Sequence, residues 1–136
     1  MNSIRTYNNL NKNKNLHPLE SSDTMIIKLQ PVFLDKIWGG DSFQKEYNYS
    51  SGITCGEAWG ISAHKSYSSV VMNTKYKGLT LRQLYNTQRH IFGNYPDSEF
   101  PILVKLIDAT TDLSIQVHPD NTYAKKEFGL GKEECW

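Results

Sequence analysis

The residues with the clearest chemical potential lie in one alternating stretch, where the polar Ser114, Gln116 and His118 alternate with apolar neighbours. In a β-strand, residues two apart point to the same face and lie about 6.6 Å from each other. An amide oxygen and an imidazole nitrogen at that spacing can converge on one divalent ion. The spacing therefore predicts a two-ligand arm of a metal site at Gln116 and His118. The same pattern is also typical of an ordinary hydrogen-bonded pair on a strand surface.

A second segment can return to this face. Residues 120–128 are expected to form a short helix that a glycine ends, and residues 132–136 to form the strand that follows it. Alternation places Lys132 and Glu134 on one face of that strand and Glu133 on the other. If the two strands pair, the carboxylate of Glu134 is a third ligand and the ammonium of Lys132 lies over the same cavity.

The strings around these residues resemble a known family. Leu-Ser-Ile-Gln-Val-His-Pro-Asp at 113–120 and Gly-Lys-Glu-Glu-Cys-Trp at 131–136 resemble the metal-binding signature of type I mannose-6-phosphate isomerases, zinc enzymes of the cupin superfamily. Ile-Trp-Gly-Gly at 37–40 and Gly-Glu-Ala-Trp-Gly-Ile-Ser-Ala-His at 56–64 are similar to further strings of the family, in the same order. The likeness covers residues 25–136, so the chain resembles the N-terminal part of the catalytic domain.

The resemblance implies a role for each residue of the two strings. Gln116, His118 and Glu134 match zinc ligands. Lys132 matches the active-site lysine, which also lies at the substrate, and Ser114 matches a serine that contacts substrate. The family takes a second histidine ligand and further basic residues from segments that would follow this sequence. We therefore expect a truncated domain with an incomplete site.

The implied reaction interconverts mannose 6-phosphate and fructose 6-phosphate, an aldose and a ketose that differ by a proton moved between C1 and C2. One bound Zn²⁺ per chain would polarise a substrate oxygen while an acid or base moves the proton. Lys132 is expected to stabilise the anion, because a protonated ammonium is a poor base. Two alternatives stay open: a sugar-phosphate-binding cupin module without turnover, and a structural β-domain whose polar face meets a partner.

Three other residues lie in strings similar to those of the family. Glu57 and Trp38 could border the sugar pocket, although tryptophan is often used for packing and carboxylates for backbone bonds. His64 is expected to be a hydrogen-bonded structural histidine rather than a metal ligand.

The elements that must position these residues are mainly strands. Residues 27–30 alternate apolar and polar side chains until Pro31 interrupts any ladder, and short segments with β-branched and aromatic residues predict strands at 53–62 and 70–74. The nearly continuous apolar run at 102–107 predicts a buried strand. Thr80 and Gln83 form a capping-box pair, which predicts a peripheral helix that Gly93 ends. We expect a mainly β fold, part of a cupin-like β-sandwich or barrel.

Length and charge limit the remaining possibilities. The 136 residues suit one domain, and residues 1–24, rich in Asn and poor in large apolar side chains, are expected to be a disordered N-terminal extension. A net charge of +1 does not favour nucleic acid or an anionic membrane as a partner. No apolar stretch is long enough to span a bilayer, and the two cysteines lie far apart. We therefore expect a cytoplasmic protein, and the resemblance implies a small sugar phosphate as its partner.

Overall fold

The structure is a computed structural model that describes residues 25–48, 54–129, 131 and 133–136. The extension predicted at residues 1–24 lies outside this described part. No described helix is long and apolar enough to cross a membrane.

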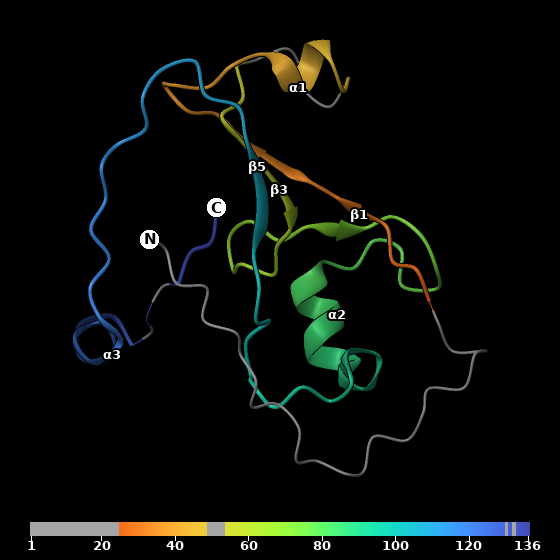
Figure 1. The fold of residues 1–136 in the computed structure, drawn as a ribbon. Helices are drawn as coiled ribbons and strands as arrows, with labels where there is room; N and C mark the ends of the chain where they lie inside the picture. The colour runs from red at the N-terminus through yellow and green to blue at the C-terminus, as the bar shows by residue number, and fades with distance from the viewer. Residues whose placement is uncertain (1–24, 49–53, 130, 132) are drawn as a thin grey trace, which may run out of the picture.

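Antiparallel strands build the centre of the molecule (Figure 1). In the described residues they form two sheets, one of β1 (Leu29–Gln30) with β4 (Val70–Val71) and one in the order β2-β3-β5. The second sheet consists of β2 (Val32–Leu34), β3 (Glu57–Ile61) and β5 (Val104–Ile107). Each predicted strand segment up to residue 74 contains a strand, although each strand is shorter than predicted. The mainly β class is confirmed.

β5 differs from the prediction of a buried strand at 102–107. The strand begins only at Val104, and the exposed fractions of Val104 and Leu106 are 45% and 56%. Lys105 and Ile107, on the other face, are half-buried. A continuous apolar run cannot distinguish a strand covered on both faces from one covered on a single face, and here only one face is covered.

Three helices accompany the sheets in the described part: α1 (Ser42–Lys45), α2 (Leu81–Thr87) and α3 (Asn121–Phe128). The predicted capping box of α2 is confirmed, since the Thr80 side chain accepts from the Gln83 N–H and the Gln83 side chain accepts from the Thr80 N–H. The helix ends earlier than predicted, at Thr87. A 3₁₀ turn, η1 (Arg89–Phe92), continues to Gly93, whose φ of 66° is the left-handed conformation that favours glycine.

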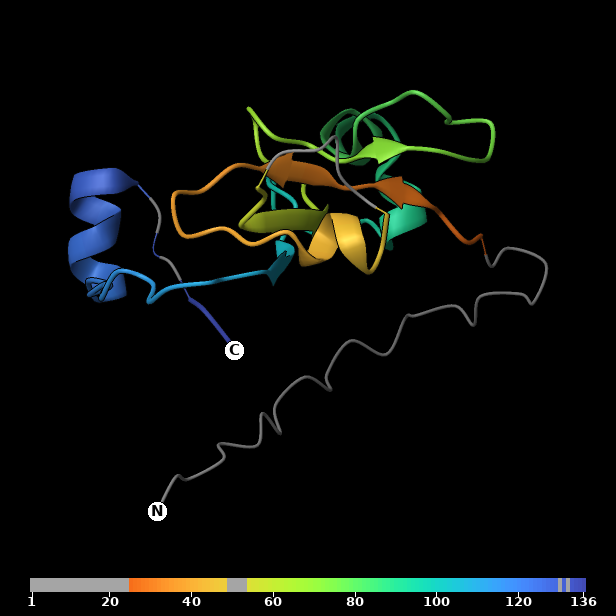
Figure 2. The ribbon, with the colours of Figure 1, turned by 90° about the horizontal axis from the view of Figure 1, so that it is seen from above.

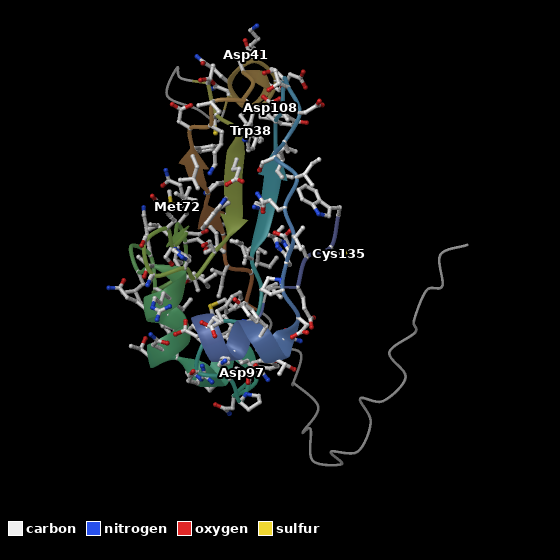
Figure 3. All side chains as sticks on the ribbon, turned by 90° about the vertical axis from the view of Figure 1, so that its left-hand side faces the viewer. Trp38, Asp41, Met72, Asp97, Asp108 and Cys135 are labelled. Atoms are coloured by element: carbon white, nitrogen blue, oxygen red, sulfur yellow. The ribbon has the colours of Figure 1, made fainter. Side chains whose placement is uncertain are left out.

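The residue after β5 connects the sheet to α1. The Asp108 carboxylate accepts from the backbone N–H of Ser42 at 2.7 Å and from its hydroxyl at 3.1 Å. Phe43 of α1 packs in a buried cluster with Cys55 and Ala58. Trp38, Asp41 and Asp108 consequently lie at the same end of the sheet (Figure 3).

The C-terminal segments are less regular than predicted. The predicted helix is present as α3, with Asp120 as its N-cap and Gly129 after its last turn. The predicted strands are not formed in the described residues: 113–118 and 133–136 run as extended chain (Figure 1) but pair with no described strand, and residue 132 of the second prediction lies outside the described part. α3 therefore stands apart from the two sheets, joined to β5 by an extended connection (Figure 2).

Candidate functional site

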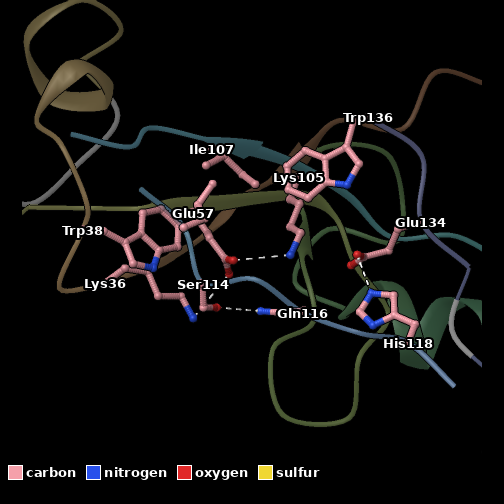
Figure 4. Close-up of a pocket in the computed structure, with 11 residues that line it drawn as sticks. Lys36, Trp38, Glu57, Lys105, Ile107, Ser114, Gln116, His118, Glu134 and Trp136 are labelled. Carbon is pink, nitrogen blue, oxygen red and sulfur yellow. Dashed lines mark hydrogen bonds and ion pairs between the residues drawn. The ribbon is translucent and has the colours of Figure 1, made fainter. Parts of the chain in front are cut away.

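A pocket of about 660 Å³ lies between the three-stranded sheet and the extended C-terminal segments (Figure 4). Its walls combine side chains from β3, β5, the loop after β2 and both extended segments. The lining residues are Lys36, Trp38, Glu57, Lys105, Ile107, Leu113, Ser114, Gln116, His118, Glu134 and Trp136.

From Ser114 onward the extended segment before α3 keeps the predicted alternation although it pairs with no described strand, whereas Leu113, predicted on the opposite face, also lines the pocket. Ser114, Gln116 and His118 all line the pocket, whereas the side chains of Ile115 and Val117 are almost fully exposed. An extended backbone points successive side chains to opposite sides whether or not a second strand pairs with it. The prediction that the three polar residues share a face is confirmed.

His118 and Glu134 meet inside the pocket. The Nε2 atom of His118 lies 2.7 Å from Oε2 of Glu134, and both side chains are half-buried. α3 lies between them in the chain, and its N-cap is Asp120, whose side chain accepts from the N–H of Tyr123 at 2.8 Å. The chain thus passes through α3 and brings a carboxylate sixteen residues after His118 to its imidazole.

Gln116 lies beside this pair in the pocket. Its amide nitrogen donates to Oγ of Ser114 at 3.1 Å, and its amide oxygen carries the lone pairs that a cation needs. Imidazole nitrogen, carboxylate oxygen and amide oxygen form a mixed donor set of the kind that zinc accepts. The residues present therefore fit a zinc ion, although the described residues contain no group of three His, Cys, Asp or Glu side chains that could hold a metal.

Ser114 and Lys132 are the two predicted site residues that are not metal ligands. Ser114 lines the pocket, whereas Lys132 lies outside the described residues. Glu133 is exposed and does not line the pocket, as the alternation predicts.

Glu57 is the best-connected charged group of the pocket wall. It is only 8% exposed, and its carboxylate accepts from the indole N–H of Trp59 at 3.0 Å. Lys105 Nζ lies 3.3 Å from Oε1, and Lys36 Nζ lies 3.5 Å from Oε2. Burial by itself would raise the pKa of this carboxyl, but the indole hydrogen bond and the two ammonium charges outweigh burial and lower the pKa below 4.5.

The two lysines escaped the sequence-based prediction. Lys105 is the single charge within the apolar run at 102–107, and a charged residue in a strand predicted to be buried requires a partner. That signal points to an acidic residue on a neighbouring strand. Lys36, which precedes Trp38 in a loop, carries no comparable signal.

His64 lies outside the pocket lining. Its Nδ1 accepts from the backbone N–H of Ser66 at 3.2 Å, and its ring packs against Trp59 and Tyr67. These contacts agree with the structural role expected from the sequence. Glu57 and Trp38, considered as pocket residues from the sequence, both line the pocket.

Comparisons with known proteins agree with the resemblance. The sequence pattern of phosphomannose isomerase type I, catalytic domain, matches residues 26–133. Mannose-6-phosphate isomerase of Streptococcus mutans is 50% identical over 114 residues, which cover 79% of this chain and 36% of that protein. Mannose-6-phosphate isomerase ManA of Bacillus subtilis is 46% identical over 110 residues, which cover 79% of this chain and 35% of that protein.

A solved structure extends the likeness to three dimensions. The crystal structure of mannose 6-phosphate isomerase from Bacillus subtilis superposes with a TM-score of 0.73 at 44% sequence identity, covering 77% of this chain and 34% of that one. The chain thus spans about a third of the length of these relatives, and the expected cupin fold is confirmed. On sequence and fold together, the chain belongs to the type I phosphomannose isomerase family.

Proposed function

We propose that the protein is a zinc-dependent isomerase that interconverts mannose 6-phosphate and fructose 6-phosphate. The observation that carries this proposal is the meeting of His118 and Glu134 at 2.7 Å, in the pocket that Gln116 and Ser114 also line. The names of the relatives support the reaction, and the donor set of the pocket supports the metal.

Gln116, His118 and Glu134 would hold one zinc ion per chain. When bound, zinc supplies a Lewis acid that draws electron density from a substrate oxygen and so acidifies the adjacent C–H group. Ser114 would orient the substrate through its hydroxyl. Lys132 would stabilise the negative charge that forms when the proton leaves carbon, because a nearby ammonium lowers the energy of that anion.

The partner in this proposal is a small sugar phosphate rather than nucleic acid or a membrane. A net charge of +1 gives no strong overall attraction to a polyanion, which favours a small-molecule ligand. The free thiols of Cys55 and Cys135 suit a reducing cytoplasm, where we place the protein.

Turnover in a complete enzyme tests the reaction. In a hybrid, residues 26–136 of this chain replace the matching segment of the Streptococcus mutans relative, and zinc content and isomerisation of mannose 6-phosphate are measured. We expect stoichiometric zinc and turnover, both lost in the hybrid carrying His118→Ala. A folded hybrid that binds zinc and mannose 6-phosphate without turnover would favour the non-catalytic module, and a folded hybrid without zinc would contradict the metal assignment.

A further inference from the structure

A single buried carboxylate connects two cationic side chains on the pocket wall. Each oxygen of Glu57 faces one ammonium, with Lys105 on Oε1 at 3.3 Å and Lys36 on Oε2 at 3.5 Å (Figure 4). The indole N–H of Trp59 fixes the carboxylate from a third direction at 3.0 Å. Neither lysine belongs to the set of residues that the metal proposal uses.

The sheet brings these groups together from distant parts of the chain. Glu57 lies on the central strand β3, and in the register with β5 Trp59 faces Lys105, so Lys105 is a diagonal neighbour of Glu57 on the same face. Lys36 follows β2, the strand on the other side of β3. The three charged side chains therefore come from the central strand β3, from β5 on one side of it, and from the loop that follows β2 on the other.

Gly56 lets Lys36 approach this closely. A Cβ atom on Gly56 would lie 2.6 Å from Cβ of Lys36 and 2.7 Å from Cζ3 of Trp38, closer than real Cβ atoms come to a neighbour. The stem of Lys36 therefore packs directly on the backbone beside Glu57. Any side chain at position 56 would push the ammonium away from its place.

The paired lysines keep hydrogen-bonding capacity for a ligand. An ammonium has three N–H donors, and one contact with Glu57 leaves donors that can face the pocket. Both lysines are half-buried and line the cavity, where a charge-assisted hydrogen bond is stronger than in open solvent. Two cations against one carboxylate leave this part of the wall with net positive charge, which suits an oxyanion.

We propose that Glu57 is a positioning residue that holds the ammonium groups of Lys36 and Lys105 on the pocket wall, where they bind the anionic oxygens of a phosphate monoester. The identity of that ligand as a sugar phosphate rests on the proposed function. The binding of phosphate itself does not, because it involves neither the metal ligands nor turnover.

Binding of inorganic phosphate to the metal-free 136-residue chain tests the proposal. The titration is followed by NMR in the presence of a chelator, and near-UV circular dichroism verifies that each variant is folded. Lys36→Met and Lys105→Met keep most of the side-chain volume, and each should weaken phosphate binding about tenfold, the loss of one charge-assisted contact. Lys77→Met removes the same charge from an exposed position outside the pocket and should change binding less than about twofold. Equal effects of all three substitutions, or no phosphate binding by the native chain, would overturn the proposal.

Glu57→Gln tests whether Glu57 positions the two lysines or only contributes a negative charge that competes with the ligand. A carboxylate that merely competed with the ligand would, when neutralised, leave phosphate binding unchanged or tighter. If Glu57 positions the two ammonium groups, binding should weaken about threefold or more, and Lys36→Met should then cost less than it does in the native chain. Tighter or unchanged binding, or fully additive effects, would contradict the positioning role.

Gly56→Ala gives a second measurement that leaves every charge in place. The added methyl group displaces the stem of Lys36, so phosphate binding should weaken while the net charge stays constant. Native-like binding by a folded Gly56→Ala chain would argue against the proposal even if Glu57→Gln failed to fold. Loss of zinc or turnover in the hybrid enzyme, with phosphate binding intact, would reject the proposed reaction and leave this inference standing.

Discussion

Two carboxylates of the pocket, Glu134 and Glu57, show how surroundings decide the role of one residue type. The side chain of Glu134 is half-buried and contacts the imidazole of His118, a partner that it can exchange for a divalent ion. Glu57 is buried against two ammonium groups and an indole N–H, which satisfy its oxygens and keep it ionised. The first carboxylate is therefore suited to ligation and the second to holding other side chains.

Glu134→Gln should lose zinc. The neutral amide is a poorer ligand, and affinity should fall at least about tenfold, since even changes behind the direct ligands have effects of that size. Zinc content after dialysis, measured on the hybrid enzyme described above, checks this. Glu133→Gln is the matched control, because Glu133 is exposed and outside the pocket lining. Equal zinc content in the two variants would reject Glu134 as a ligand.

Lys132→Met should separate catalysis from metal binding. The substitution keeps all three candidate ligands, so zinc should stay in the hybrid enzyme while turnover falls. A fall in kcat indicates stabilisation of charge in the transition state, and a rise in KM indicates a contact made equally with the bound substrate. Full activity of Lys132→Met would show that the role implied by the resemblance is wrong here.

The lowered pKa of Glu57 predicts a pH-dependent contribution to stability. Because the pKa in the folded state lies below the ordinary 4.5, the ionised carboxylate stabilises the fold above pH 4.5, and this contribution is lost as the pH falls through the folded-state pKa. Glu57→Gln should therefore cost about 1–3 kcal/mol of unfolding free energy at pH 7 and progressively less below pH 4.5. Urea unfolding at a series of pH values measures this difference.

The exposed Glu46 supplies the control for that experiment. Glu46→Gln removes the same charge from the end of α1 and should change stability by less than about 0.5 kcal/mol at every pH. A cost of Glu57→Gln that stayed constant down to pH 3 would mean that its ionised form makes no special contribution to the fold.

At the scale of the elements, close backbone contacts decide where strands and loops lie. Gly40 pairs with Cys55 and Gly39 with Ala109 in isolated bridges at the end of the sheet that carries α1. A Cβ atom on Gly39 would lie 2.6 Å from the backbone nitrogen of Gly56. The loop that carries Lys36 and Trp38 can therefore reach β3 only because a glycine follows them.

Gly39→Ala should destabilise the fold by about 2 kcal/mol or more, because the added methyl group meets rigid backbone rather than a side chain that can move. Gly60→Ala is the matched control, since a Cβ atom there lies in ordinary contact, 3.8 Å from the carbonyl oxygen of Val104. It should change the unfolding free energy by less than about 0.5 kcal/mol. Urea denaturation of the two variants tests this contrast, and equal stabilities would contradict the close approach.

At the scale of the whole molecule, the apolar packing seen in the described residues divides into two small clusters. One surrounds Phe43, Cys55 and Ala58, and the other surrounds Val71, Tyr76 and Leu84 beneath α2. The segment that carries the candidate ligands contributes to neither cluster. The stability of the fold should therefore depend mainly on the residues before Leu113, and less on the C-terminal segments that line the pocket.

Removal of residues 1–24 should leave stability unchanged. Their Asn-rich, apolar-poor composition offers too little burial to offset the entropy of ordering them. The melting temperatures of the whole chain and of a chain starting at Met25 provide the measurement. A clear drop on removal of the extension would show that these residues pack against the rest of the protein.

Local patterns in the sequence determined the features that depend on near neighbours. The capping box at Thr80, the helix that begins after Asp120, and the shared side of Ser114, Gln116 and His118 were all predictable. Helix caps act over three or four residues, and the alternation of side chains belongs to any extended backbone, so neither needs knowledge of the partner. The family resemblance, carried by contiguous strings, was predictable for the same reason.

Only the tertiary structure decided how distant segments meet. It placed Glu134 at 2.7 Å from His118, across the length of α3, without the strand pair that the sequence predicted. It also paired Glu57 with Lys36 and with Lys105, which is 48 positions away, and left one face of β5 exposed. Strand order and the coverage of a face depend on long-range contacts, and the local sequence of a strand does not contain that information.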